Sequence, residues 1–256
     1  KHKIIETYLQ TNTESYDDAE RIGLDTLARI FREYNDGDIL FFTWGVNKIR
    51  FLVDYINKNS PSNVVALPFY SELADKWKTI AENTNYISNL TINKQDILTE
   101  IEIPGSGRTV SIGTYSRAII VATNIAEASI TIINLKHVID TGYYNLVSYD
   151  TMDDKSIQKV EKITEASRKQ RKGRVGRRSS GWVWYMYAEG SRENVNAEYN
   201  ICNTSISGEI FKMLYDGNKT HLIPKYFLME DMYDKRTECR TFLDKLTMFQ
   251  PQALEG

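Results

Sequence analysis

The stretch AIIVATNIAEASITI, residues 118–132, joins an unbroken apolar run to a polar turn and then to a further apolar-rich run. Residues 118–122 predict a buried strand, and the residues after the turn predict the start of a helix. Thr123 and Asn124 then stand where a strand ends and a helix begins, which is the edge at which open α/β sheets bind their ligands. We therefore work outward from this segment.

Short β-rich runs alternate with helical patterns on both sides of it, which predicts an α/β fold with a mostly parallel sheet flanked by helices. Ser15 is a candidate cap for a helix whose apolar side chains at Leu24, Leu27, Phe31 and Tyr34 follow helical spacing. A second helix is expected over residues 46–56. The other predicted strands are residues 39–43 (ILFFT), 63–67 (NVVAL, ended by Pro68), 136–140 (KHVID) and 182–187 (WVWYMY).

Three regions depart from this alternation. Residues 83–116 are polar and weakly periodic, which indicates an insertion or a long loop. Residues 144–149 and 156–163 flank a turn-prone stretch and predict a protruding β-hairpin. Beyond Gly190, Ile206, Ile210 and Leu214 recur at helical spacing and Gly217 is the expected stop. We therefore divide the chain into a main domain, 1–190, and a small helical appendage or the start of a further domain, 191–256.

Composition excludes several classes of protein. A chain of 256 residues with 41% hydrophobic and 26% charged residues is ordinary for a soluble domain. No apolar run approaches the roughly 20 residues that cross a bilayer, and no signal peptide is evident, so we expect an intracellular protein without a membrane partner. The two cysteines and three histidines predict neither a disulfide nor a metal site: Cys202, Cys239, His2, His137 and His221.

The basic segment QRKGRVGR, residues 170–177, carries the most specific chemical signal. The net charge of −2 argues against bulk attraction to nucleic acid, but this segment concentrates positive charge locally. Arg171, Arg174 and Arg177 recur every three residues, so in a helix they would occupy neighbouring positions. Gly173 and Gly176 disfavour a helix and suggest the close approach of a triphosphate or another backbone. Guanidinium groups match the geometry of phosphate oxygens, so the segment suits a phosphate ligand. The plainer alternatives for such a basic segment are a solvated helix face and a nuclear-import signal.

The set of motifs resembles the second RecA-like domain of superfamily 2 DExH/DEAH-box RNA helicases. QRKGRVGR resembles helicase motif VI, and the particular form that this motif takes here resembles that of the poxvirus-type DExH RNA helicases. Residues 122–132 resemble motif V, residues 137–145 the strand and turn that follow it, and residues 39–45 and 66–73 motifs IV and IVa. These segments follow the family's order over most of the chain, and a large DNA virus is a reasonable guess at the source.

The resemblance implies roles for individual residues. Gln170, Arg174 and Arg177 match the catalytic residues that reach the γ-phosphate of ATP, with the arginines as fingers, and Gly173 lies among them in the nucleotide-binding segment. Thr123 and Asn124 match residues that couple nucleotide to nucleic acid. Thr43, Gly45 and Ser71 match contacts to RNA phosphates, and the hairpin matches a strand-separating wedge.

Each of these roles has a plainer alternative. Thr123, Asn124 and Ser71 could cap helices, Gly45 could only turn the chain, and the hairpin could extend the sheet. The sequence also departs from the family pattern, with Ala122 in place of Ser, Ala128 in place of Thr, and Trp44 inside the motif IV turn. The aromatic residue that stacks on adenine has no firm candidate; Trp77 is a weak one.

The sequence lacks the parts that grip ATP. It contains neither a G-x-x-x-x-G-K-[ST] loop nor a D-E-x-H segment, and Gly105 to Thr109 is only a decoy for the former. ATP and Mg²⁺ would therefore be bound mainly by the first RecA-like domain of the same polypeptide, and this chain alone should not hydrolyse ATP. Expected partners are that domain and RNA, in the cytoplasm or nucleus of a host cell or in a virion. The alternatives are a DNA helicase domain and a non-catalytic RNA-binding module; a dinucleotide-dependent oxidoreductase fails for want of G-x-G-x-x-G.

Overall fold

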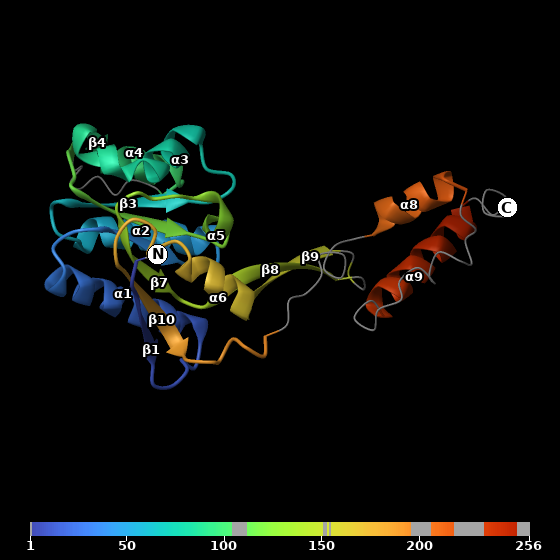
Figure 1. Ribbon diagram of the computed structural model, residues 1–256. Helices are drawn as coiled ribbons and strands as arrows, with labels where there is room; N and C mark the ends of the chain where they lie inside the picture. Colours follow the sequence, from blue (N-terminus) through green and yellow to red (C-terminus); the bar gives the residue numbers. More distant parts are fainter. Residues whose placement is uncertain are drawn as a thin grey trace. The chain divides into compact units, whose positions relative to one another are not determined.

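The computed structural model describes residues 2–103, 112–150, 153, 155–195, 206–217 and 233–249. They fall into two units, residues 1–145 with 160–195 and residues 146–159 with 196–256. In the first unit, six parallel strands form a sheet in the order β1-β10-β7-β2-β6-β3 (Figure 1). The strands are β1 (Ile4–Leu9), β2 (Asp38–Phe42), β3 (Val64–Phe69), β6 (Arg117–Ala122), β7 (Leu135–Asp140) and β10 (Gly181–Ala188).

Five of these strands confirm the predictions, with two corrections at the edges of the sheet. β1 was not predicted, because its sequence IIETYL interrupts the apolar residues with Glu6 and Thr7 and none of its six positions is fully buried. Pro68 does not end β3, which continues to Phe69. The proline is tolerated because β3 is an edge strand that pairs with β6 alone, so no ladder bond requires its missing N–H.

Helices cover both faces of the sheet. α1 (Tyr16–Glu33) begins where predicted, with the Ser15 hydroxyl accepting a hydrogen bond from the Asp18 N–H, and α2 (Val46–Asn59) follows β2. Gly23 of α1 packs against the ring of Phe41, whereas the guanidinium of Arg171 in α6 (Glu165–Lys172) lies over the ring of Phe42. Since neighbouring residues of a strand point to opposite faces, α1 and α6 lie on opposite sides of β2.

Of the two alternatives for residues 83–116, an insertion or a long loop, the long loop is wrong. After α3 (Asp75–Glu82) come η1 (Thr84–Asn89), β4 (Ile92–Asn93), α4 (Lys94–Glu100) and β5 (Ile112–Gly113), with β4 and β5 paired antiparallel. Their buried isoleucines join the main core: Ile87, Ile92, Ile97 and Ile101. Each element is too short to show a period in the sequence, and tertiary burial stabilises it instead. The decoy Gly105 to Thr109 lies outside the described residues.

The hairpin is confirmed as β8 (Tyr143–Asp150) paired with β9 (Lys155–Lys162). Within the first unit, the amide of Asn145 donates to the Trp44 carbonyl at 3.0 Å and that of Ile163 donates to the Gly142 carbonyl at 3.0 Å. The first bond holds the base of the hairpin beside the loop after β2, and the second joins the two ends of the hairpin to each other. The turn expected over 150–154 lies partly outside the described residues, which omit 151, 152 and 154.

The second unit contains α8 (Ser207–Tyr215) and α9 (Tyr233–Phe249). Ile206 and Ile210 pack against Cys239 and Leu243, and the Ile206 amide donates to the Glu238 carboxylate at 2.9 Å. Gly217 adopts φ +84°, so it ends α8 as predicted. The predicted helical character is confirmed here, while the division at residue 190 stays a prediction; Cys202 and His221 lie outside the described residues. In the part of the chain that the structure describes, no helix is long and apolar enough to cross a membrane.

Candidate nucleotide and nucleic-acid site

The ends of three adjacent strands bring the predicted nucleic-acid residues together. Ala122 is the register partner of both Phe42 and Phe69, so β2, β6 and β3 end at the same level. The next residue in each loop therefore emerges at one edge of the sheet, and the Thr43 amide extends the ladder by donating to the Ala122 carbonyl at 2.8 Å. This is the ligand edge expected of an open parallel sheet.

The predicted residues at this edge differ in their exposure. Ser71 and Asn124 are exposed and Thr123 is half-buried. Thr43 is completely buried, and its hydroxyl has no hydrogen-bond partner among the described residues. Gly45 is buried as well, and a Cβ there would collide with the side-chain amide of Asn145. Thr43 thus presents no exposed hydroxyl in this structure and close packing gives one reason for Gly45, while the expectation that the two residues contact phosphates stays a prediction.

Helix capping does not account for the exposed polar residues. α5 (Ala126–Ser129) has Ile125 at its N-cap and no side-chain capping bond, and the N-cap of α3 is Ala74. The side chains of Thr123, Asn124 and Ser71 are thus not used to start these helices. Their exposure at a shared sheet edge leaves them available to a ligand.

The predicted row of arginines on one helix is wrong. α6 begins after Thr164, whose hydroxyl accepts from the Ser167 N–H, and it ends at Lys172 with Gly173 as its C-cap. Arg171 lies in the helix, whereas Arg174 and Arg177 lie in the turn beyond it. Gly176 has a φ of +74°, which is incompatible with a helix, so the chain does not return to a helix between Gly173 and Arg177.

Arg171 is part of the core. Its guanidinium, with 0% exposure, donates to Asp140 Oδ1 at 2.7 Å and to Glu127 Oε1 at 2.9 Å. Burial alone would lower the pKa of Arg171, but the two carboxylates raise it. The Ser167 hydroxyl also donates to Glu127 Oε1. Arg171 is therefore committed to internal partners and links α6 to α5 and β7.

Arg174 and Arg177 are bound differently. Arg174 is half-buried and donates to the carbonyls of Gln170 (3.3 Å) and Ile130 (3.2 Å). Arg177 is exposed and donates to the Gly173 carbonyl (3.0 Å) and the Thr131 hydroxyl (3.3 Å). Neither forms an ion pair with a described carboxylate. Burial, and then the charge of Arg177, lowers the pKa of Arg174. Two neighbouring guanidiniums without an ion-pair partner among the described residues, with exposed Gln170 next to them, favour a bound anion.

The structure explains the glycine at position 176 differently from the glycine at position 173. A Cβ on Gly176 would lie 2.5 Å from Ile4 Cγ1, so the close approach that the sequence suggested is made there by β1 and not by a ligand. Gly173 has φ −64°, which any residue adopts, and is exposed. Only Gly173 therefore stays a candidate for contact with a nucleotide.

Other expectations are also corrected or narrowed. Trp77, the weak candidate for stacking on adenine, is 5% exposed and offers no face for it. His137 is buried against Trp184, whose indole N–H donates to His137 Nδ1 at 3.2 Å, and burial lowers the pKa of His137 to about 3. Among the described residues, no group of three or more His, Cys, Asp or Glu side chains could hold a metal.

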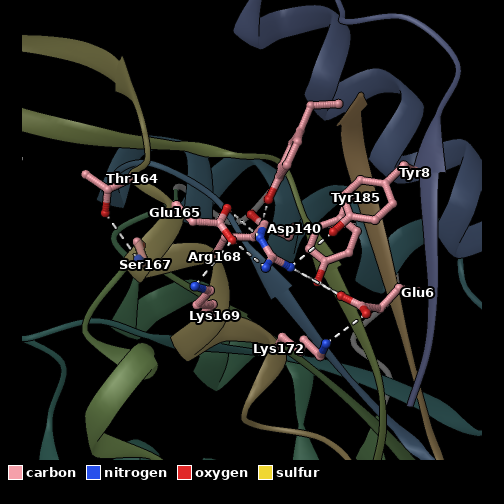
Figure 2. A network of polar contacts seen from close by, with 11 residues as sticks. Glu6, Tyr8, Asp140, Thr164, Glu165, Ser167, Arg168, Lys169, Lys172 and Tyr185 are labelled. Atoms are coloured by element: carbon pink, nitrogen blue, oxygen red, sulfur yellow. Dashed lines mark hydrogen bonds and ion pairs between the residues drawn. The ribbon is translucent and has the colours of Figure 1, made fainter. Parts of the chain in front are cut away.

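A second polar network on α6 was missed by sequence reasoning, because it depends on β1. Arg168 Nη1 lies 3.2 Å from Glu6 Oε1, 2.9 Å from the Tyr185 hydroxyl and 3.1 Å from the Tyr8 hydroxyl. Lys172 donates to the other oxygen of Glu6 at 2.8 Å. Figure 2 shows Arg168 reaching from the helix toward Glu6 and Tyr185. An unexplained Glu inside an apolar run was the one signal in the sequence.

Comparison with known families identifies the domain. The model of the helicase conserved C-terminal domain matches residues 47–179, more than half of the chain. The chain belongs to the helicase C-terminal domain family. The matched region contains the ends of β3 and β6, Glu127, Gln170 and the arginine turn, whereas β2 and Thr43 precede it.

Relatives of this helicase domain include a putative ATP-dependent RNA helicase (R366) of Acanthamoeba polyphaga mimivirus, 39% identical over 75% of this chain and 11% of the relative. The ATP-dependent RNA helicase HrpA of Escherichia coli is 31% identical over 72% of this chain and 12% of its own length. A crystal structure of the Escherichia coli DExH-box NTPase HrpB matches with a TM-score of 0.63 at 23% identity, over 85% of this chain and 24% of that one. The RecA-like fold is thereby confirmed, and this helicase domain spans a small part of the relatives it matches.

Proposed function

We propose that this chain is the second RecA-like motor domain of an ATP-dependent RNA helicase, which supplies arginine fingers to an interdomain ATP site. The observation that carries the proposal is the state of Arg174 and Arg177: carbonyls and one hydroxyl hold the two guanidiniums, and neither forms an ion pair with a described carboxylate. Charge of this kind stabilises the charge that develops on a transferring phosphoryl group.

The residues present fit one side of a nucleotide site. Guanidinium forks and the exposed amide of Gln170 suit phosphate oxygens, while no carboxylate cluster for Mg²⁺ occurs among the described residues. The sequence also lacks a phosphate-binding loop. ATP·Mg²⁺ would be gripped by the first RecA-like domain of the same polypeptide, and Gln170, Arg174 and Arg177 would complete the site, beside the exposed Gly173. The chain alone would not hydrolyse ATP.

The RNA contacts in this proposal are made by Ser71, Thr123 and Asn124 at the common strand edge. Glu127 connects that edge to the nucleotide side, because it follows Asn124 by one turn and accepts hydrogen bonds from Ser167 and Arg171 of α6. Closure around ATP would thus be transmitted to the loop after β6. Residues 144–163 would serve as the strand-separating hairpin, and residues 191–256 as an appendage or part of a further domain.

Arg174→Ala tests the finger role in the polypeptide that carries both motor domains. We expect RNA-stimulated ATPase turnover to fall by about 10³-fold or more, since a finger arginine is worth roughly 10³ to 10⁵ in rate. Folding and RNA affinity should stay unchanged. Arg178→Ala is the matched control, because Arg178 is exposed in the same basic turn and is assigned no role. Unchanged turnover in Arg174→Ala would remove the assignment.

Two rival functions remain, and the same protein separates them. A DNA helicase would unwind a DNA duplex faster than an RNA duplex of matched sequence. A non-catalytic RNA-binding module would bind RNA but show no turnover even with both domains present. We expect ATP-dependent unwinding with a preference for RNA.

A further inference from the structure

We propose that Glu6 of β1 and Arg168 of α6 form a positioning clamp, which sets the orientation of α6 and thereby aims Gln170 and Arg174 at the nucleotide. The proposal rests on the function proposed above. Arg168 and Glu6 are positioning residues: neither is expected to touch ATP. The clamp is the contact between the edge strand β1 and the helix that precedes the finger arginines (Figure 2).

The clamp gathers several groups around one carboxylate. Glu6 Oε1 accepts from Arg168 at 3.2 Å and from the Tyr185 hydroxyl at 2.7 Å, and Glu6 Oε2 accepts from Lys172 at 2.8 Å. Arg168 also makes a two-point contact with Glu165 at 2.8 and 2.6 Å. The ring of Tyr8 stacks on that of Tyr185 with centroids 4.2 Å apart, so the two phenols that contact Arg168 hold each other in place.

α6 needs a second anchor. The helix has eight residues, and the turn after it contains no helix or strand until β10 begins at Gly181. Arg171 ties one side of α6 to β7 and α5, which would still let the helix rotate about that attachment. Arg168 and Lys172 lie one turn apart and are both held by Glu6 of β1, an element that Arg171 does not contact through these ion pairs. Attachments to two different strands, β1 and β7, define the orientation of the helix, and with it the direction of Gln170.

The clamp is stronger than an ordinary surface ion pair. Only 12% of the Arg168 side chain is exposed, against 27% for Glu6. Burial raises the pKa of Glu6, but the hydrogen bonds from Lys172 and Tyr185 and the charge of Arg168 outweigh it, so that the pKa is lowered. Glu6 is therefore charged at neutral pH. The planar fork of Arg168 serves Glu6, Glu165 and two phenols at once, which a lysine ammonium cannot reproduce.

β1 does not depend on the clamp for its place in the sheet. β1 already pairs with β10 in parallel register from Ile4↔Gly181 to Thr7↔Trp184, and Ile4 packs against Gly176. Loss of the charge on Glu6 would leave that ladder intact. The element that loses an attachment is α6. The effect of a clamp variant should therefore appear in the geometry of the fingers more than in the stability of the fold.

The test is steady-state ATPase kinetics of Arg168→Gln and Glu6→Gln in the polypeptide with both motor domains. A misplacement of about 1 Å can cost about 10²-fold in rate, so we expect kcat to fall about 10- to 100-fold. KM for ATP should change less than about two-fold, because the other domain holds most of the nucleotide. Arg168→Lys keeps the charge without the fork and should recover only part of kcat.

Two controls separate positioning from stability. Arg29→Gln breaks an exposed ion pair on α1 with Glu33, 2.8 Å long, and should leave kcat unchanged. Ile30→Val removes one buried methyl group and should lower the melting temperature without lowering kcat. If the clamp variants lose kcat only in proportion to their melting temperature, as Ile30→Val does, the clamp is structural and the proposal is wrong.

Arg174→Ala, measured in parallel, distinguishes the two proposals. Loss of turnover in Arg174→Ala with normal kcat in both clamp variants would overturn the clamp and leave the finger role standing. Normal turnover in Arg174→Ala would overturn the finger role, and the clamp with it. Loss in Arg174→Ala together with a drop in kcat at constant KM in the clamp variants is the result we expect.

Discussion

Arg171 Nη1 lies 2.7 Å from Asp140 Oδ1, and both side chains are completely buried. Asp140 also accepts from the Tyr187 hydroxyl at 2.6 Å and from the Gly142 N–H at 2.8 Å, so both of its oxygens are hydrogen-bonded. The first arginine of QRKGRVGR thus belongs to the interior of the domain, while the next two face outward. One short motif therefore contains a buried arginine that attaches α6 to the core, Arg171, and two arginines available to a ligand, Arg174 and Arg177.

Arg171→Met should destabilise the domain severely. It leaves Asp140 and Glu127 buried without their cation, and removing one partner of a buried pair costs about 3–5 kcal/mol. Urea unfolding of the chain measures this, with Arg178→Met as the exposed control, expected within about 0.5 kcal/mol of the native chain. Asp140→Asn combined with Arg171→Met should recover part of the loss. A cost below about 1 kcal/mol for Arg171→Met would contradict this description of the core.

Asp38 should make stability depend on pH. Its carboxylate accepts from Thr84 Oγ1 at 2.7 Å and from the Ala118 N–H at 2.9 Å, and burial raises its pKa from 3.8 to about 6. The folded state therefore binds this proton more tightly than the unfolded state does. The stabilisation is complete below pH 3.8 and is lost as the pH rises through about 6.

Asp38→Asn isolates this contribution. The amide can accept from Ala118 and donate to Thr84, so both hydrogen bonds survive without a charge. The free energy of unfolding of the variant, relative to the native chain, should grow by about 3 kcal/mol from low to neutral pH, with about half of that between pH 5 and pH 7.5. Urea unfolding at several pH values checks it; a difference independent of pH would show that Asp38 titrates normally.

Gly173→Ala and Gly176→Ala should separate contact with a nucleotide from backbone strain. Gly176 has φ +74° and no room beside Ile4, so alanine there should cost about 1–3 kcal/mol of stability. At Gly173 the added Cβ would lie 3.3 Å from two carbonyl oxygens, and the change in stability should stay below about 1 kcal/mol. Thermal unfolding and ATPase turnover are measured on both. Loss of turnover without loss of stability in Gly173→Ala supports close approach of the nucleotide; full turnover argues against it.

Ser71→Ala and Asn124→Ala should weaken RNA binding without changing its salt dependence. A neutral hydrogen bond to phosphate is worth about 0.5–1.5 kcal/mol, or roughly 2- to 10-fold in affinity, and it releases no counterion. The loss should be equal for RNAs of different sequence, since phosphates carry no sequence information. Fluorescence anisotropy over a range of salt concentrations tests this, with Thr99→Ala on α4 as the control. A steeper or shallower salt slope would mean that these residues act through a neighbouring charge.

The predictable part of the fold is the part that local pattern specifies. The apolar runs of β2, β3, β6, β7 and β10, and the helical spacing of α1 and α2, are recognisable because these elements bury a whole strand or a regular helix face. β1 escaped because an edge strand needs fewer apolar residues and carries Glu6 for a partner 162 residues away, Arg168. The short elements between residues 84 and 113 escaped because contact with the core, and not their own propensity, stabilises them.

The sequence by itself determined the family, the parallel sheet and the chemistry on offer, since motif order, apolar periodicity and residue type are local properties. Only the tertiary structure decided which arginines are free. Arg171 forms ion pairs with carboxylates of β7 and α5, whereas Arg174 and Arg177 donate hydrogen bonds only to carbonyls and a hydroxyl. It also decided that Thr43 is buried and that β1 holds α6. The physical reason is that the availability of a charged or polar group depends on what surrounds it in space, and those neighbours come from distant parts of the chain.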